Sequence, residues 1–100
     1  MLRVEFQDIA NAIVIRMEGL FTGGFAVTAG DFVARCRIPS RIVIDLSEVS
    51  LIDFTGEEVL CRLSRIGVNF IADTPYAQGV CERLKLPLLR KRGWTCRYKV

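Results

Sequence analysis

Hydrophobic and polar residues alternate at the start of the chain. Leu2, Val4 and Phe6 are separated by charged or amide residues, and this period of two predicts a half-buried strand. Residues 12–17 follow after a short polar stretch and are apolar and rich in β-branched side chains, which predicts a second strand. Because few residues separate the two strands, we expect an antiparallel hairpin.

The next segment has helical spacing. After Gly23 and Gly24, one face of a predicted helix carries Phe25, Ala29, Phe32, Val33 and Cys36. The continuous apolar run at residues 41–46 then predicts a central strand that is covered on both faces.

The second half of the chain repeats this alternation of strand and helix. Val59, Leu60, Leu63 and Ile66 mark the apolar face of another helix, for which Gly67 is a suitable left-handed cap. Residues 68–72 predict a short strand, Thr74 and Pro75 are typical of a helix start, and Pro87 ends that helix. A last alternating strand is predicted at residues 94–100.

The element order β-β-α-β-α-β-α-β predicts one α/β domain over residues 1–100. We expect a mixed, largely parallel five-stranded sheet with three main helices and an antiparallel hairpin at the start. The chain has 100 residues, of which 51% are hydrophobic, so it can bury a core of its own. It lacks both the roughly 18 consecutive apolar residues of a membrane span and a signal-peptide pattern. We therefore expect a cytoplasmic protein that does not insert into membranes.

Catalytic and metal-binding residue types are scarce. The chain has no histidine, and its four cysteines form no C-x-x-C pair, so a zinc site and the usual Ser-His or Cys-His nucleophiles are not expected. We expect reduced, buried thiols, no cofactor and no enzymatic activity. One alternative stays open, in which Asp45, Asp53 and Asp73 at strand ends hold Mg²⁺ with a phosphate.

Charge is unevenly distributed along the chain. Residues 42–61 carry five acidic and no basic side chains, whereas residues 83–100 carry seven basic and no acidic ones, although the net charge is only +3. The segment Arg90, Lys91 and Arg92 could contact nucleic acid or anionic lipid. Such runs are more often solvated loops, so nucleic acid is not an expected partner.

The corner between the central strand and the next helix reads D-F-T-G-E-E. Thr55-Gly56-Glu57-Glu58 matches a capping box, in which the Thr55 hydroxyl accepts from the backbone near Glu58 and the Glu58 carboxylate reaches back. The same corner also suits a switch. A phosphate on Thr55 would meet the helix N-terminus yet face Asp53, Glu57 and Glu58, while Gly56 would leave room for an approaching molecule.

Three stretches resemble the STAS domain family of anti-sigma-factor antagonists and sulphate-transporter tails. "RIVIDLSEVSLIDFTGEEVL" is similar to the family's central motif, a strand with D-L-S followed by D-S-S-G at a helix start. "VIRMEGLFTGGFA" and "GVNFIADTPYAQGVCERLKL" resemble flanking elements, so the likeness covers residues 10–90. The chain departs from the pattern at Phe54, which replaces a small residue, and at Glu57 and Glu58, which replace residues that are more often apolar.

The resemblance implies a bacterial regulator of transcription that binds proteins and is not a catalyst. Thr55 takes the place of the phosphoacceptor, which a partner kinase that is also the anti-sigma factor modifies, so that partner binding is switched by phosphorylation. The expected partner-binding residues surround it and are Asp53, Phe54, Gly56, Glu57 and Glu58. The alternative is an unswitched STAS subunit of a lipid or anion transport complex, in which Thr55 is only a helix cap.

Overall fold

Four strands and three helices make up residues 1–89, the part of the chain that the computed structural model describes. In chain order they are β1 (Leu2–Ile9), β2 (Ala12–Phe21), α1 (Gly23–Ala34), a 3-10 turn (Pro39–Arg41), β3 (Ile42–Ile52), α2 (Phe54–Arg65), β4 (Asn69–Ile71) and α3 (Pro75–Arg83). The expected α/β class and the three helices are confirmed. The described residues form four strands rather than five, and the last strand expected, at 94–100, lies outside them.

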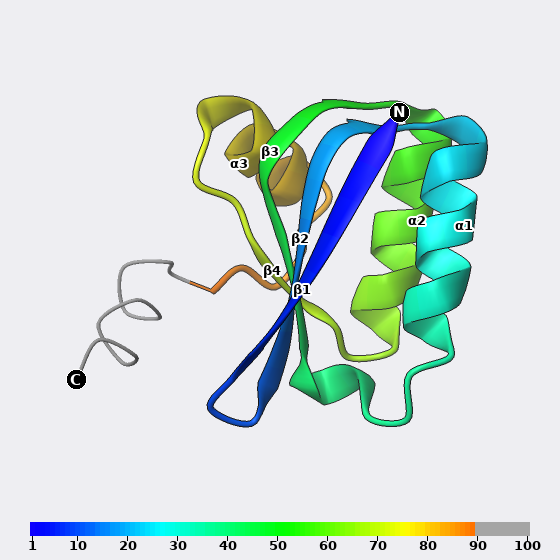
Figure 1. The fold of residues 1–100 in the computed structure, drawn as a ribbon. Helices are drawn as coiled ribbons and strands as arrows, with labels where there is room; N and C mark the ends of the chain where they lie inside the picture. The colour runs from blue at the N-terminus through cyan, green and yellow to red at the C-terminus, as the bar shows by residue number, and fades with distance from the viewer. Residues whose placement is uncertain (90–100) are drawn as a thin grey trace.

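The strands lie in the sheet in their order along the chain. β1 pairs with β2 in an antiparallel hairpin, and β2–β3 and β3–β4 are parallel pairs, so the mixed sheet is confirmed. Ala10 and Asn11 both have positive φ, as a two-residue hairpin turn requires. Each parallel pair is joined through a helix, and α1 and α2 lie side by side along the sheet (Figure 1).

The main core lies between the sheet and the helices. It combines strand residues such as Ile15, Ile44 and Phe70 with buried residues of all three helices. A smaller apolar cluster of Val14, Val43 and Ile71 occupies the other side of the sheet. β3 is buried without interruption over residues 42–47, which confirms the predicted central strand.

Local end signals act as expected at two helices. The Thr74 hydroxyl accepts from the N–H of Ala77 at 3.2 Å and caps α3. Gly67 follows α2 with φ of 108°, and the N–H of Val68 donates back to the carbonyl of Leu63 at 3.1 Å. This is the left-handed glycine ending that the sequence predicted.

The buried face of α1 differs from the predicted one. Ala26, Gly30 and Val33 are buried, whereas Phe25 and Phe32 are 51% and 54% exposed. The reason is the close approach of α2, since a Cβ on Gly30 would lie 2.4 Å from a methyl group of Val59. Small residues therefore face α2, and the two aromatic rings lie toward β1.

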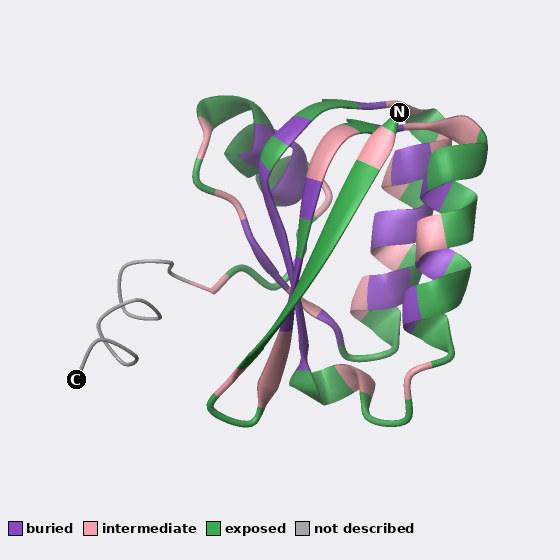
Figure 2. Ribbon diagram, in the orientation of Figure 1, coloured by how far each residue is buried: buried purple, intermediate pink, exposed green. Residues whose placement is uncertain are grey.

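β1 is also more exposed than a half-buried strand. Val4 is 37% and Phe6 is 51% exposed, and Figure 2 shows exposed residues along most of the strand. β1 lies at the edge of the sheet, where α1 covers its apolar face only in part. The predicted strand is confirmed, but the predicted half-burial is wrong, because the extent of burial depends on what covers the face.

Candidate partner-binding site at the start of α2

Asp53 is the N-cap of α2. One carboxylate oxygen accepts from the N–H of Gly56 at 2.8 Å, and the other accepts from the N–H of Gly23 at 3.1 Å. Gly23 is the first residue of α1, whose own N-cap, Thr22, makes no side-chain cap. A single carboxylate thus satisfies orphan donors at the starts of two helices.

Thr55 is not the cap, which corrects the capping-box interpretation. It is the second residue of α2, inside the first turn, because the helix begins at Phe54 rather than after Thr55. Its half-buried side chain makes no hydrogen bond to any of residues 1–89, and Glu58 does not reach back to it. The Thr55 hydroxyl therefore does not cap α2.

Packing within the chain explains why residue 56 is a glycine. It is buried, and a Cβ added to it would lie 2.2 Å from the backbone oxygen of Phe21 and 3.0 Å from a methyl group of Ile52. The space beside Gly56, which we expected to be open to an approaching molecule, is filled by the end of β2. The glycine lets α2 start directly against the sheet.

Phe54 projects from the corner. It is 74% exposed, the highest value after Met1 among the large apolar residues of the described range 1–89. A ring that folds back into the core is excluded by this exposure. An exposed aromatic residue at a helix start is a feature that protein contacts use, since aromatic side chains contribute large contact areas.

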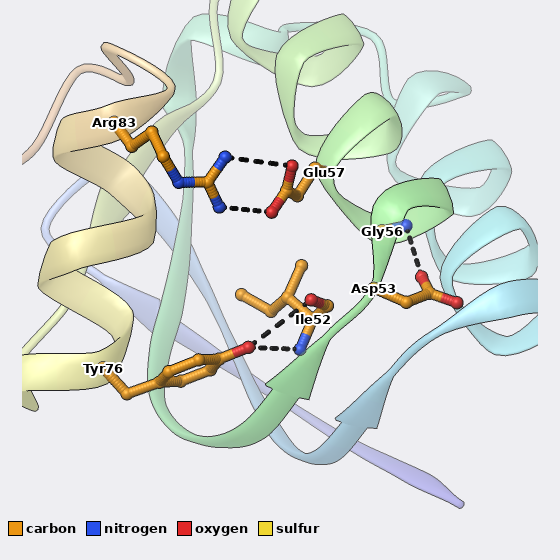
Figure 3. Close-up of polar contacts among 6 residues, drawn as sticks. All are labelled: Ile52, Asp53, Gly56, Glu57, Tyr76 and Arg83. Carbon is orange, nitrogen blue, oxygen red and sulfur yellow. Dashed lines mark hydrogen bonds and ion pairs between the residues drawn. The ribbon is translucent and has the colours of Figure 1, made fainter.

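Glu57 is held by α3. Its carboxylate makes a two-pronged ion pair with the guanidinium of Arg83, with one N–O distance of 3.2 Å and a second, shorter contact (Figure 3). The hydrogen bond from Arg83 is the main cause that lowers the pKa of Glu57 below its usual value. Glu57 therefore stays charged, and its carboxylate faces α3.

Tyr76 ties α3 to the end of β3. The N–H of Ile52 donates to the Tyr76 hydroxyl at 2.7 Å, and the hydroxyl lies 3.4 Å from the carbonyl of Ile52 (Figure 3). Ile52 directly precedes Asp53, so this contact joins α3 to the strand end that leads into the corner. Neither Tyr76 nor Arg83 was predicted, because no local pattern places α3 beside this strand end.

Glu58 lies on the other side of the first turn. It is exposed, and with Thr55, Arg62 and Arg65 it lines a shallow hollow of about 300 Å³. The corner thus presents an apolar ring, a hydroxyl that makes no hydrogen bond within residues 1–89 and a carboxylate that makes no ion pair within them, with arginines one to two turns away. Such a surface is suited to contacts with a protein.

The Mg²⁺ alternative finds no support in the geometry. Asp45 lies inside β3 rather than at its end and is buried, where it accepts from the N–H of Ser47 at 2.9 Å. The Ser47 hydroxyl in turn accepts from the N–H of Asp73 at 3.1 Å. Within residues 1–89, no three potential ligands gather in a group that could hold a metal ion.

Three further predictions concern other parts of the chain. Cys36, Cys61 and Cys81 are free thiols, and only Cys81 of these is fully buried, while Cys96 lies outside the described residues. The basic segment 90–92 lies outside them as well. Of the helices in residues 1–89, none is both long and apolar enough to span a bilayer.

The comparisons with known proteins show the fold. No protein-family model matches the chain, and no curated protein sequence matches it. The structure is similar to the crystal structure of an anti-sigma factor antagonist from Mycobacterium paratuberculosis, with a TM-score of 0.73 and 18% identity over 88% of this chain and 85% of that one. It is also similar to part of a structure of Mglu, with a TM-score of 0.54 and 22% identity over 71% of this chain and 19% of that one. The fold predicted from the resemblance to STAS domains is therefore shared with a protein of the antagonist class.

Proposed function

We propose that this chain is a regulatory protein-binding module of the anti-sigma-factor-antagonist kind, that its partner binds the start of α2, and that phosphorylation of Thr55 weakens this binding. The observation that carries the proposal is that Asp53, and not Thr55, caps α2. Asp53 performs the capping, and the Thr55 hydroxyl makes no hydrogen bond within residues 1–89. The similar fold of the anti-sigma factor antagonist from Mycobacterium paratuberculosis supports the same class of function.

The unmodified corner supplies the contact surface. Phe54 is the apolar anchor, and Glu58 is the exposed carboxylate that a basic group of the partner would meet. Asp53 and Gly56 shape the corner from within, and Glu57 contributes negative charge although Arg83 compensates part of it. The proposed partner is therefore a protein with an apolar pocket rimmed by positive charge.

A phosphate on Thr55 would change this surface in two ways. It adds about two negative charges at pH 7 beside Asp53 and Glu58, and it adds bulk next to the exposed ring of Phe54. The helix N-terminus stabilises the phosphate itself, so the modified protein stays folded. The consequence falls on the partner, which loses access to the ring.

The test begins with capture of partners from the cytosol of the source organism on four immobilised proteins: wild type, Thr55→Ala, Thr55→Asp and Phe54→Ala. A captured protein is then purified and titrated into each of the four proteins, and calorimetry gives the four dissociation constants. We expect Thr55→Ala to bind within about twofold of wild type, and Thr55→Asp and Phe54→Ala to bind at least about tenfold more weakly. Ile38→Ala is the control, because Ile38 is 50% exposed and precedes the start of β3, whereas the corner follows the end of that strand.

Phosphoryl transfer is tested separately. The purified partner with Mg-ATP should add one phosphate to wild type and none to Thr55→Ala, as mass spectrometry would show. Equal affinities of Thr55→Ala and Thr55→Asp, with no transfer, would refute the switch and favour the unswitched subunit of a transport complex. Binding that Phe54→Ala does not weaken would move the contact surface away from this corner.

A further inference from the structure

The two edges of the sheet differ. Beside β4, the N–H of Phe70 donates to the carbonyl of Pro87 at 2.9 Å, and the N–H of Leu89 donates to the carbonyl of Phe70 at 2.7 Å, so chain covers that edge. β1 pairs with β2 on one side, and none of residues 1–89 pairs with its other side. An uncovered edge strand is a template for another strand.

An apolar groove runs beside this open edge. It has a volume of about 320 Å³ and lies between the inward face of the hairpin and α1. The rings of Phe6 and Phe32 meet edge to face across it at 5.5 Å, and both are about half exposed. The residues that line it are Leu2, Val4, Phe6, Ile15, Met17, Phe25, Thr28, Ala29 and Phe32.

The backbone groups at the edge can be assigned from the hairpin. The N–H of Leu20 donates to the carbonyl of Met1 at 3.1 Å, and the register pairs Leu2 with Gly19. Because hydrogen-bonded pairs alternate in an antiparallel ladder, the odd-numbered residues of β1 bond to β2. The N–H and C=O groups of Leu2, Val4 and Phe6 therefore point outward.

Charges on the opposite face of β1 are arranged in alternation. Arg3 lies opposite Glu18 of β2, and Glu5 lies opposite Arg16, with a distance of 3.9 Å between the Glu5 carboxylate and the Arg16 guanidinium. Like charges on the edge would repel a second strand. Here the outer strand carries one charge of each sign, two residues apart.

We propose that the open edge binds a second copy of this chain, with the two β1 strands antiparallel about a two-fold axis at Val4. In this register Val4 lies opposite Val4 of the second copy, and Leu2 lies opposite Phe6. Arg3 then lies opposite Glu5 of the second copy, twice by symmetry.

Neighbouring registers lack this complementarity. An axis at Glu5 brings two glutamates together, and an axis at Arg3 brings two arginines together. With the axis at Val4, the row across both copies reads Arg16, Glu5, Arg3, Glu18, so every neighbouring pair has opposite charge. The outward backbone groups form ladder hydrogen bonds, and the groove of each copy is extended by that of the other.

Sedimentation velocity on the full chain tests the dimer. Wild type should associate, and the association should weaken as NaCl is raised. Arg3→Glu and Glu5→Arg should each raise the dimer dissociation constant by on the order of tenfold or more, because each creates two like-charge pairs across the interface between the copies. Mixing these two variants should restore a heterodimer, and the double variant Arg3→Glu/Glu5→Arg should restore the homodimer.

The control variant replaces an arginine with glutamate at a position away from the edge. Arg37 is exposed in the turn after α1 and makes no ion pair within residues 1–89, so Arg37→Glu should dimerise as wild type does. Circular dichroism melts confirm that each variant is folded. Because the mixed variants must recover binding, a simple loss of hairpin stability cannot imitate the expected pattern.

Cross-linking tests the register. Val4→Cys should form an intermolecular disulfide under mild oxidation, because directly opposite residues bring their Cα atoms to about 5.5 Å. Phe6→Cys should not, since the two copies of that position lie four residues apart along the strands. A wild type that stays monomeric into the millimolar range would overturn the proposal and leave the edge to a strand of another protein. Failure of the mixed variants to associate, or cross-linking at Phe6→Cys alone, would overturn the register.

Discussion

The double cap at Asp53 predicts that one side chain stabilises two helix starts at once. The two N–O distances are 2.8 Å to Gly56 and 3.1 Å to Gly23. Hydrogen bonds to a charged acceptor contribute about 1.5–3 kcal/mol each when sheltered, and Asp53 is half-buried, so we take the lower end for both. Asp53→Ala should therefore lower the free energy of unfolding by about 2–4 kcal/mol, which exceeds the usual single-cap loss of about 1 kcal/mol.

Asp53→Asn separates the two contributions. Its amide retains one acceptor oxygen but turns an NH₂ group toward the second N–H, so the loss should be about half that of Asp53→Ala. Urea unfolding followed by circular dichroism measures both variants against Asp8→Ala, which removes an exposed carboxylate from β1. A loss below about 1 kcal/mol for Asp53→Ala, or equal losses for Ala and Asn, would refute the two-helix role.

Three further predictions concern packing, an ion pair and a thiol. Gly56→Ala should cost about 3 kcal/mol because its Cβ would overlap backbone, whereas Gly24→Ala should be neutral or slightly stabilising because nothing lies within 4 Å of its Cβ; comparable urea midpoints for the two would contradict this. Arg83→Gln should raise the pKa of Glu57 toward its usual value, as a carboxyl-carbon NMR titration would show. Since the wild-type pKa of Glu57 is lowered, the stability from this pair is present above the unfolded-state pKa and is lost as pH falls through the folded-state pKa. The free energy of unfolding of Arg83→Gln should therefore fall less on acidification than that of wild type. Burial raises the pKa of Cys81 to about 11, so iodoacetamide at pH 8 should modify it only as fast as the protein unfolds, and rapid modification of the native protein would contradict this.

The resemblance and the local signals pointed to the candidate corner, but not to the contacts that its residues make. The motif singled out Asp53, Phe54 and Thr55, and the structure places the three together at the start of α2, with Phe54 the exposed one. The assignment of the cap to Thr55 was wrong because T-x-x-E and D-x-x-G are both acceptable cap patterns. Which one is used depends on where Gly56 can pack against the sheet.

The sequence by itself determined the class of fold, the element order from β1 to α3, the end of α2 and the start of α3, although β2 and β3 run further than predicted, to Phe21 and Ile52. These depend on short-range physics: alternation along a strand, periodicity along a helix, the left-handed conformation at Gly67 and the cap at Thr74. Only the tertiary structure decided which apolar residues are covered and which polar groups meet. Gly30 against α2 turns Phe25 and Phe32 toward the open edge, and the docking of α3 brings Arg83 to Glu57. Burial and pairing of this kind arise between segments far apart in the sequence, so no local pattern carries them.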